Sequence, residues 1–213
     1  MTRLKIAAFG DSLTAGSALR EGQKNWTDIL SEELDAEVKS CGIGGQTTTN
    51  ALPRMAMDVL PFEPNIVLIC FGMNDHVIID ESGKTKVSET QFAANLTEMV
   101  TQVREIGAMP ILMTPNAVIE EYYFTRHPKE WYATAGGANG QLARYCEVIR
   151  SIAQAHNLPM VDLFYESSKC DRSVLLRTPK NGGFEDGVHP YGEGIRFYAD
   201  SVLAVLRNAS ETK

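Results

Sequence analysis

The sequence predicts an α/β fold in which an open parallel sheet lies between two layers of helices. Two observations predict it: apolar segments of strand length alternate with segments whose apolar residues recur at helical spacing, and glycine-rich polar turns follow several strand segments. Strands and helices that alternate in this order form right-handed βαβ units, which build such a sheet. The chain has 213 residues and 44% apolar side chains, so we expect one domain spanning residues 1–213 with a sizeable core.

The first half of the chain contains three expected strands. They are the largely apolar segments 4–9 and 66–71 and, between them, the short segment 37–41, which runs into a glycine-rich turn. Between the first two, apolar residues recur at helical spacing from Trp26 to Leu34 and predict a helix. The segment 66–71 is apolar throughout, which is typical of a central parallel strand covered on both faces.

The second half continues the alternation with two expected strands, 109–114 and 160–162, and three expected helices. The helices are indicated by apolar stripes at Phe92, Leu96, Met99, Val100 and Val103, at Leu142, Tyr145, Cys146, Ile149 and Ile152, and at Ile195, Ala199, Val202, Leu203 and Leu206. The first of these helices is expected over 88–105. Gly107 predicts its end, because glycine readily adopts the left-handed conformation that closes a helix.

Two long segments, 115–137 and 167–187, do not fit this alternation. Irregular segments of this length are uncommon inside an α/β domain, and they often carry function because loops hold many binding and catalytic residues. We therefore expect these two segments to border a substrate cleft.

The charge balance excludes some partners. The chain carries 20 Lys and Arg against 27 Asp and Glu, a net charge of −7, and it has no run of basic residues. Because nonspecific binding to nucleic acid depends on clustered cations, we expect no nucleic-acid partner. No segment approaches the ~20 consecutive apolar residues that cross a bilayer, so we expect no membrane span.

The N-terminus and the cysteines bear on compartment and cofactors. The first apolar run stops at Gly10, which is too early for a signal peptide, so a chain that has not been trimmed is expected in the cytoplasm. The four cysteines form no CxxC pair and predict reduced, mostly buried thiols. They are Cys41, Cys70, Cys146 and Cys170. We expect no metal and no cofactor, while a homo-oligomer is left open.

Four groups of glycine and polar residues are expected where ligands bind in an open parallel sheet, beyond the carboxyl ends of its strands. They are residues 10–13 (Gly-Asp-Ser-Leu), 42–47 (Gly-Ile-Gly-Gly-Gln-Thr), 72–75 (Gly-Met-Asn-Asp) and 186–189 (Asp-Gly-Val-His). Each group alone is common in proteins of many functions. Together they contain the groups that acyl transfer requires.

Ser12, His189 and Asp186 supply the three groups of a serine-nucleophile mechanism. A serine hydroxyl becomes a good nucleophile when an imidazole accepts its proton, and a carboxylate must hold that imidazole. The oxyanion that forms needs fixed donors, which the backbone N–H groups of Ser12 and Gly45 and the Asn74 side chain can supply. The glycine-rich loop leaves phosphoester hydrolysis or nucleotide binding open, and a non-catalytic carbohydrate-binding protein is a third interpretation.

These four groups, in this order, resemble the motif blocks of the SGNH hydrolase superfamily, also called GDSL-type lipases and esterases. The resemblance covers residues 9–191 and implies a flavodoxin-like three-layer α/β/α sandwich whose five-stranded parallel sheet has the strand order 2-1-3-4-5. It also implies a metal-independent esterase. The catalytic residues that it implies are Ser12, Asp186 and His189, and the oxyanion donors are Ser12, Gly45 and Asn74.

The chain departs from the family pattern ahead of the glycine block. Ser40 and Cys41 stand where many members have a structural asparagine, so we expect the packing of that loop to differ. No glycine follows Ser12 by two residues, which argues against the α/β-hydrolase family and its G-x-S-x-G turn. Asp11 and Asp75 are expected to fix loops. The other histidines, His76, His127 and His156, are expected to be structural or solvated.

Information on the substrate comes mainly from aromatic residues in the segment 115–137. They are Tyr122, Tyr123, Phe124, Trp131 and Tyr132. They form either a small core that holds the loop or a wall of the cleft, in which case Tyr122, Tyr123 and Trp131 are the expected substrate-binding residues. We expect a small-molecule ester with an acetyl or other short acyl group, acetylated carbohydrate being one candidate. Lysophospholipase or thioesterase activity on longer acyl chains is the alternative, and the negative net charge favours neutral esters.

Overall fold

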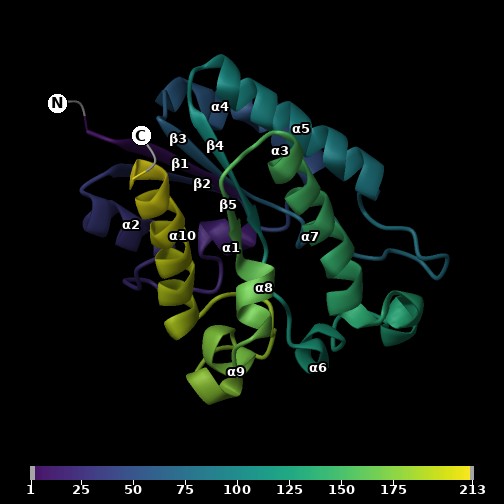
Figure 1. The fold of residues 1–213 in the computed structure, drawn as a ribbon. Coiled ribbons are helices and arrows are strands. Elements are labelled where there is room, and N and C mark those ends of the chain that lie inside the picture. The colour runs from purple at the N-terminus through teal and green to yellow at the C-terminus, as the bar shows by residue number, and fades with distance from the viewer. Residues whose placement is uncertain (1–2, 212–213) are drawn as a thin grey trace.

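The computed structural model describes residues 3–211, and its centre is a sheet of five parallel strands in the order β2-β1-β3-β4-β5 (Figure 1). The strands are β1 (Lys5–Gly10), β2 (Glu37–Gly42), β3 (Ile66–Cys70), β4 (Met109–Thr114) and β5 (Met160–Asp162). All strand pairings are parallel. The expected fold class and strand order are confirmed, and each strand lies within one residue of its expected ends.

Both faces of the sheet are covered. Alternate residues of a strand point to opposite faces, so burial of consecutive residues shows that both faces are packed. In β1, Ile6 and Ala8 belong to one core cluster, whereas Ala7 and Phe9 belong to the other, and all four are fully buried. The same alternation holds in β3, where Leu68 belongs to the first cluster. The unbroken apolar strand predicted from the sequence at 66–71 is therefore explained by burial on both faces.

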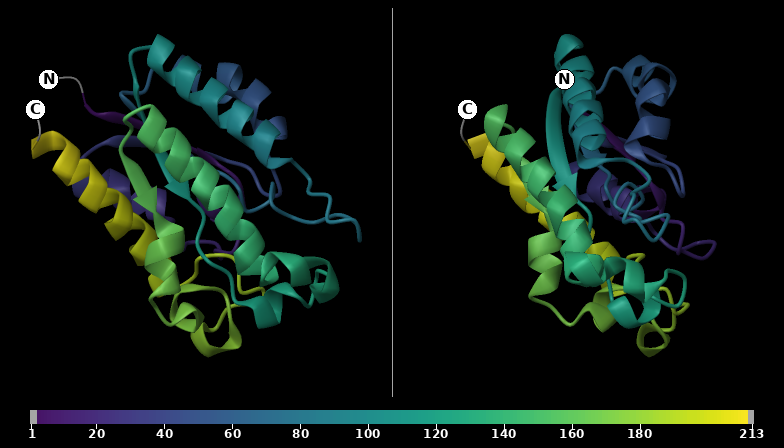
Figure 2. Two further views of the ribbon diagram at one scale, coloured as in Figure 1. Left: turned by 45° about the vertical axis from the view of Figure 1, so that its right-hand side comes forward. Right: turned by 90° about the vertical axis from the view of Figure 1, so that its right-hand side faces the viewer.

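Helices from both halves of the chain form the two outer layers. The first cluster contains residues of α2 (Trp26–Leu34) and α10 (Glu193–Glu211), and the second contains residues of α4 (Met55–Asp58), α5 (Glu89–Glu105) and α7 (Gly137–Ala155). Helix α10 packs beside α2, and α5 packs beside α7 (Figures 1 and 2). The long helices thus occupy the layers that the alternating pattern predicts.

Helix α5 begins and ends where the sequence indicates. Ser88 accepts a hydrogen bond from the backbone N–H of Gln91 at 3.2 Å and so caps the first turn. At the other end, the N–H of Gly107 donates to the carbonyl of Arg104 at 2.9 Å, and the N–H of the next residue donates to the carbonyl of Val103. These bonds satisfy carbonyl groups that have no partner within the helix. The prediction that Gly107 closes this helix is confirmed.

The segments expected to be irregular contain short helices. Segment 115–137 includes α6 (Glu120–Tyr123) and the 3₁₀ helix η3 (Lys129–Ala135), and segment 167–187 includes the end of α8 (Leu163–Ser168), α9 (Arg172–Leu175) and η4 (Pro179–Asn181). Other short helices are α1 (Ser12–Ala15), α3 (Thr48–Ala51), η1 (Leu52–Arg54) and η2 (Leu60–Phe62). A helix of about one turn is too short to show a 3.6-residue period, so hydrophobic patterning does not reveal it.

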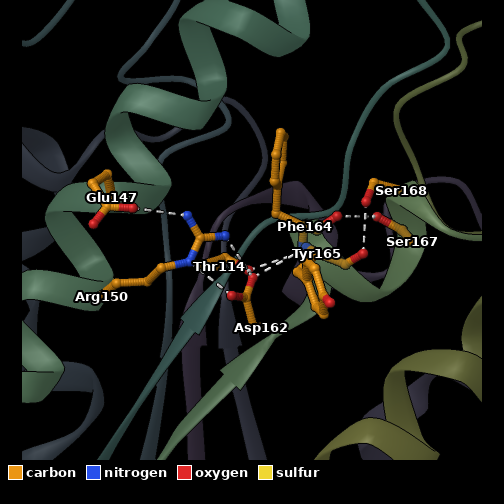
Figure 3. Close-up of polar contacts among 8 residues, drawn as sticks. All are labelled: Thr114, Glu147, Arg150, Asp162, Phe164, Tyr165, Ser167 and Ser168. Atoms are coloured by element: carbon orange, nitrogen blue, oxygen red, sulfur yellow. Dashed lines mark hydrogen bonds and ion pairs between the residues drawn. The ribbon is translucent and has the colours of Figure 1, made fainter.

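A polar cluster around Asp162 fixes the C-terminal ends of β4 and β5 (Figure 3). Arg150 of α7 donates from two nitrogens to the two carboxylate oxygens of Asp162, at 2.8 and 3.1 Å. The hydroxyl of Thr114 donates to the same carboxylate at 3.0 Å. Nearby, the hydroxyl of Ser167 in α8 accepts from the N–H of Ala117, which follows β4, at 2.9 Å. These contacts set the direction in which segment 115–137 leaves the sheet.

Two further features bear on the expectations above. Across residues 3–211, no helix combines the length and the apolar character needed to cross a membrane. Within that same range, no group of three or more His, Cys, Asp and Glu side chains is arranged to hold a metal ion. All four cysteines are free thiols, and three are buried while Cys170 is exposed, which agrees with the expected mostly buried thiols.

Candidate active site

Ser12, His189 and Asp186 form a chain of hydrogen bonds at the C-terminal end of the sheet. Ser12 is the first residue of α1, directly after β1 and Asp11. His189 Nε2 lies 2.8 Å from Ser12 Oγ, and His189 Nδ1 lies 2.9 Å from Asp186 Oδ2. Ser12 and His189 are 177 positions apart in the chain, so the fold brings them together. In this geometry Nε2 is placed to accept the hydroxyl proton of Ser12.

The Asp186 carboxylate is held by several donors. Its Oδ1 accepts hydrogen bonds from the backbone N–H groups of Val188 at 2.8 Å and His189 at 3.0 Å. Burial raises the pKa of Asp186, but the hydrogen bonds from the His189 ring and from these backbone groups outweigh burial, so that the pKa lies below its ordinary value. Asp186 is therefore ionised at neutral pH and favours the His189 tautomer whose proton is on Nδ1.

Asp11 connects α1 with the turn that follows β3. Its Oδ1 accepts from the N–H of Leu13 at 2.9 Å and caps α1, and its Oδ2 accepts from Asn74 Nδ2 at 3.1 Å. Asp11 is fully buried, and burial raises its pKa to about 7. The carboxylate of Asp11 therefore orients the Asn74 amide. Since Asp11 directly precedes Ser12, this contact holds the turn after β3 next to Ser12.

The glycine block passes close to α1. Gly42 has no room for a side chain, because a Cβ there would lie 2.3 Å from the backbone nitrogen of Ala15. A Cβ on Gly44 would lie 3.9 Å from Ser12 Cβ, so the backbone of this loop runs beside the serine. Gly45 has a φ of +76°, a left-handed conformation that glycine adopts without strain.

Ser40, just ahead of the glycine block, makes a contact with α1. Its hydroxyl donates to the carbonyl of Thr14 in α1 at 3.2 Å. The side-chain amide of Asn25 donates to the same carbonyl at 2.8 Å. Two side chains from different elements thus hold the short helix that carries Ser12.

Asp75 joins the start of α3 to the turn after β3. Its Oδ1 accepts from the backbone N–H of Thr48 at 2.8 Å and from the Thr48 hydroxyl at 2.6 Å. Asn95 of α5 donates to the same hydroxyl oxygen at 3.0 Å. Asp11 and Asp75 therefore both hold loops around Ser12, in agreement with the interpretation of these residues as loop-fixing.

His76 is buried, with both ring nitrogens in hydrogen bonds. Its Nδ1 lies 3.1 Å from the carbonyl oxygen of Gly72, and its Nε2 lies 3.2 Å from the hydroxyl of Tyr123. Burial lowers the pKa of His76 to about 4, so the ring is neutral at physiological pH. Because the carbonyl must accept from Nδ1–H, Nε2 accepts from the Tyr123 hydroxyl. His76 is therefore structural and anchors Tyr123.

The aromatic residues of segment 115–137 form a small core, and one of them also faces the cleft. Tyr123 and Tyr132 are buried, and their hydroxyl oxygens are 3.1 Å apart. The Tyr132 hydroxyl accepts from the N–H of Ile78 at 3.1 Å, which ties the segment to the loop after β3. Tyr123 stacks on His127, with ring centroids 4.3 Å apart. This core holds Tyr123 and His127 beside Ser12.

A pocket of about 150 Å³ includes Ser12 and His189. Its other lining residues are Met73, Asn74, Val77, Lys86, Tyr123, Arg126, His127 and Val188. Of the three aromatic residues expected to bind substrate, Tyr123 lines this pocket. Tyr122 and Trp131 are not among its lining residues, and their role stays a prediction. Three larger hollows, of about 420 to 570 Å³, include none of Ser12, Asp186 and His189.

Several lining residues are not identifiable from the sequence. Val77 and Lys86 lie on the loop between β3 and α5, where no period or motif distinguishes them, and Met73 is a variable position inside the Gly-Met-Asn-Asp block. Arg126 and His127 stand next to the aromatic residues in the sequence, and that neighbourhood is the one signal that points to them. His127 was expected to be structural or solvated, whereas the structure places it in the pocket wall.

The motif blocks and this geometry agree with a match to a known family. The model of the GDSL-like lipase/acylhydrolase family matches residues 8–197, a range that includes Ser12, Asn74, Asp186 and His189. The chain belongs to the GDSL-like lipase/acylhydrolase family. It is accordingly a carboxylic ester hydrolase.

Two relatives illustrate the sequence similarity of this family member. The chain is 36% identical over 169 residues to the uncharacterized lipoprotein YqeF of Bacillus subtilis, which covers 74% of this chain and 69% of YqeF. It is 33% identical over 202 residues to the isoamyl acetate-hydrolyzing esterase 1 homolog of Bos taurus, which covers 91% of this chain and 77% of that protein.

Solved structures of other family members share the fold. The lipase/acylhydrolase from Enterococcus faecalis superposes with a TM-score of 0.75 at 23% identity, covering 97% of this chain and 96% of that one. Axe2, an acetylxylan esterase from Geobacillus stearothermophilus, gives a TM-score of 0.71 at 22% identity, covering 95% of this chain and 93% of that one.

Proposed function

We propose that this family member is a serine esterase that hydrolyses acetyl and other short acyl esters, with Ser12 as its nucleophile. The hydrogen-bond chain from Ser12 through His189 to Asp186 carries the proposal. It is the arrangement in which an imidazole takes the proton of a serine hydroxyl while a carboxylate holds the imidazole.

Each proposed step uses a group in this site. Ser12 Oγ attacks the ester carbonyl while His189 Nε2 accepts its proton, and Asp186 stabilises the resulting imidazolium. The N–H groups of Ser12 and Gly45 and the amide of Asn74 donate to the oxyanion. His189 then gives its proton to the departing alcohol, which leaves an acyl group on Ser12. Water, deprotonated by His189, releases the acid and restores Ser12.

Pocket size and relatives support a short acyl group. The pocket at Ser12 measures about 150 Å³, which is smaller than the ~300–1,000 Å³ of sites that enclose drug-sized ligands. The names of two relatives refer to acetyl esters, isoamyl acetate and acetylxylan. An acetylated carbohydrate is one candidate substrate, with Tyr122, Tyr123 and Trp131 as its aromatic contacts. The alternative is a lysophospholipase or thioesterase for longer acyl chains.

The proposal is tested by replacing the nucleophile. We expect Ser12→Ala to lower kcat for p-nitrophenyl acetate by about 10⁴-fold or more. Ser168→Ala is the matched control, because that hydroxyl bonds to a carbonyl within α8 (Figure 3) and is expected to leave activity unchanged. A Ser12→Ala enzyme with wild-type activity would exclude the mechanism. Octanoate hydrolysed faster than acetate would favour the longer-chain alternative.

Other features of the chain stay predictions. These are one domain over residues 1–213, the cytoplasmic location, the absence of a nucleic-acid partner, and the open question of a homo-oligomer. One relative is named a lipoprotein, so location in particular needs direct measurement, for example by fractionation of cells that produce the protein.

A further inference from the structure

The residues that line the pocket at Ser12 carry a net positive charge, whereas the whole chain is negative. The chain carries 27 Asp and Glu against 20 Lys and Arg. Two of the ten residues that line the pocket, Lys86 and Arg126, are cations, and none is Asp or Glu. The field that a ligand meets in a cleft depends on nearby charges more than on net charge, because salt screens distant ones. The negative net charge is therefore a poor guide to the substrate.

Neither cation is neutralised by a carboxylate. Among the residues whose side chains the structure describes, neither Lys86 nor Arg126 takes part in an ion pair. Other arginines of this chain are paired, as Arg196 is with Glu33. Lys86 and Arg126 thus keep their full charge for a ligand.

Backbone hydrogen bonds hold the guanidinium of Arg126 and the backbone of Lys86. A guanidinium nitrogen of Arg126 donates to the carbonyl oxygen of Asp186 at 3.0 Å, which attaches Arg126 to the loop that carries His189. That carbonyl is an uncharged acceptor, so the bond orients the guanidinium without cancelling its charge. The N–H of Lys86 donates to the carbonyl of Val77 at 2.9 Å, which holds the backbone of Lys86 beside another residue that lines the pocket.

Both positive charges act on His127, which lines the same pocket. The pKa of His127 lies below its ordinary value, first because of burial and then because of the positive charges of Arg126 and Lys86. His127 is therefore neutral at physiological pH, and its ring stacks on Tyr123. The wall thus combines two cations with a neutral stacked pair of rings, an arrangement that suits a planar or compact anion.

We propose that this pocket selects esters that carry a carboxylate or a phosphate group, which binds between Lys86 and Arg126 while the ester carbonyl lies at Ser12. The proposal rests on the proposed esterase function of Ser12 and adds the substrate class. It replaces the neutral esters that the net charge favours, because the lining residues and not the outer surface meet the substrate.

The first experiment compares anionic esters with neutral partners of similar shape. In one set, the anion is on the alcohol portion of the ester. 4-Acetoxybenzoate, with a carboxylate, and 4-acetoxyphenyl phosphate are each compared with neutral 4-acetoxybenzamide. Mono-p-nitrophenyl adipate, against p-nitrophenyl hexanoate, places the anion on the acyl portion, at a distance where the carboxylate does not readily attack its own ester. Each kcat/KM is divided by the uncatalysed rate for the same ester. We expect at least one anionic ester to be preferred roughly tenfold.

The second experiment removes the charges one at a time. Lys86→Met and Arg126→Met are each expected to reduce that preference about fivefold to tenfold. Lys84→Met is the matched control, because Lys84 is an exposed lysine of the same loop that does not line the pocket. It is expected to keep the preference. Arg126→Lys retains the positive charge and is expected to keep most of the preference for anionic esters. Added salt is expected to weaken the preference.

The results separate this proposal from the proposed function. Loss of activity in Ser12→Ala together with equal kcat/KM for all matched esters overturns the anion site and leaves the esterase. If no ester is hydrolysed, the Ser12→Ala protein is titrated calorimetrically with 4-acetoxybenzoate and with 4-acetoxybenzamide. Tighter binding of the carboxylate that depends on Lys86 supports the site. Equal binding, or a preference that survives both Met variants, overturns it.

Discussion

The side-chain amide of Asn74 donates to the carboxylate of Asp11 at 3.1 Å, and Asp11 directly precedes Ser12. The same carboxylate caps the helix that begins at Ser12, through the N–H of Leu13. One buried side chain therefore orients both the proposed nucleophile and a proposed oxyanion donor. Asp11 is thus a positioning residue, whose effect on the reaction passes through Ser12 and Asn74.

Asp11→Asn is expected to lower kcat for p-nitrophenyl acetate by about 10²-fold. Asparagine has one acceptor oxygen where aspartate has two, so it cannot accept from both Leu13 and Asn74. We expect KM to change little, because the contacts disturbed are those to the transition state. Near-ultraviolet circular dichroism controls for folding. An unchanged kcat in a folded variant would contradict the positioning role.

Asp11 also gives the stability of the protein a dependence on pH. Burial raises its pKa from 3.8 to about 7, so the folded protein keeps a proton that the unfolded chain releases within this range. The contribution of Asp11 to the free energy of unfolding is therefore complete below the pKa that Asp11 has in the unfolded chain. It falls by up to about 4 kcal/mol as pH rises to about 7. We expect urea unfolding to show Asp11→Asn gaining stability relative to wild type from about pH 4 to 7. A difference that stays constant with pH would argue against this shift.

Asp186→Asn is expected to lower kcat about 10⁴-fold at neutral pH. The amide can present its NH₂ group to His189 Nδ1, which favours the tautomer whose proton is on Nε2 and prevents that nitrogen from accepting the Ser12 proton. Asp171→Asn is the matched control, because Asp171 is an exposed carboxylate that pairs with Lys180. Steady-state kinetics of both variants on p-nitrophenyl acetate check the expectation. Similar kcat values for the two would remove Asp186 from the mechanism.

Tyr123→Phe is expected to lower the free energy of unfolding by about 1–3 kcal/mol. The change leaves His76 Nε2 buried without its donor and removes the contact with the Tyr132 hydroxyl. Tyr122→Phe, at the half-buried neighbouring position, is the control and is expected to cost less. Urea unfolding of both variants measures the difference. Equal losses would mean that the buried hydroxyl does not anchor the segment.

Gly42→Ala is expected to destabilise the protein by about 1–3 kcal/mol or more. Its Cβ would lie 2.3 Å from the backbone nitrogen of Ala15, and backbone cannot rotate aside as a side chain can. Gly44→Ala is the comparison, since the nearest heavy atom to its Cβ would be the Ser17 hydroxyl oxygen at 3.4 Å. Thermal unfolding of both variants tests this. Equal Tm values would contradict the close packing of this loop on α1.

The fold was largely predictable because its elements leave local patterns. The segment 66–71 is apolar at every position, and Gly107 stands at the stop of a helical stripe, so both are visible without tertiary information. Helix α6 and its neighbours are too short to show a period, and they were missed for that reason. Ser12 was predictable at this end of the sheet because it directly follows a strand. His189 follows no strand, and the motif blocks pointed to it.

The sequence by itself determined the strands, the long helices and the residue types at the strand ends, since each depends on neighbours a few positions away. Tertiary structure decided that Asn74 bonds to Asp11, that Tyr123 bonds to His76, and that Lys86 and Arg126 share one pocket. These pairings join segments that are distant in the chain, and their geometry depends on how loops pack on the sheet. A local pattern carries no record of such contacts, so the charge of the pocket emerges only once the chain is folded.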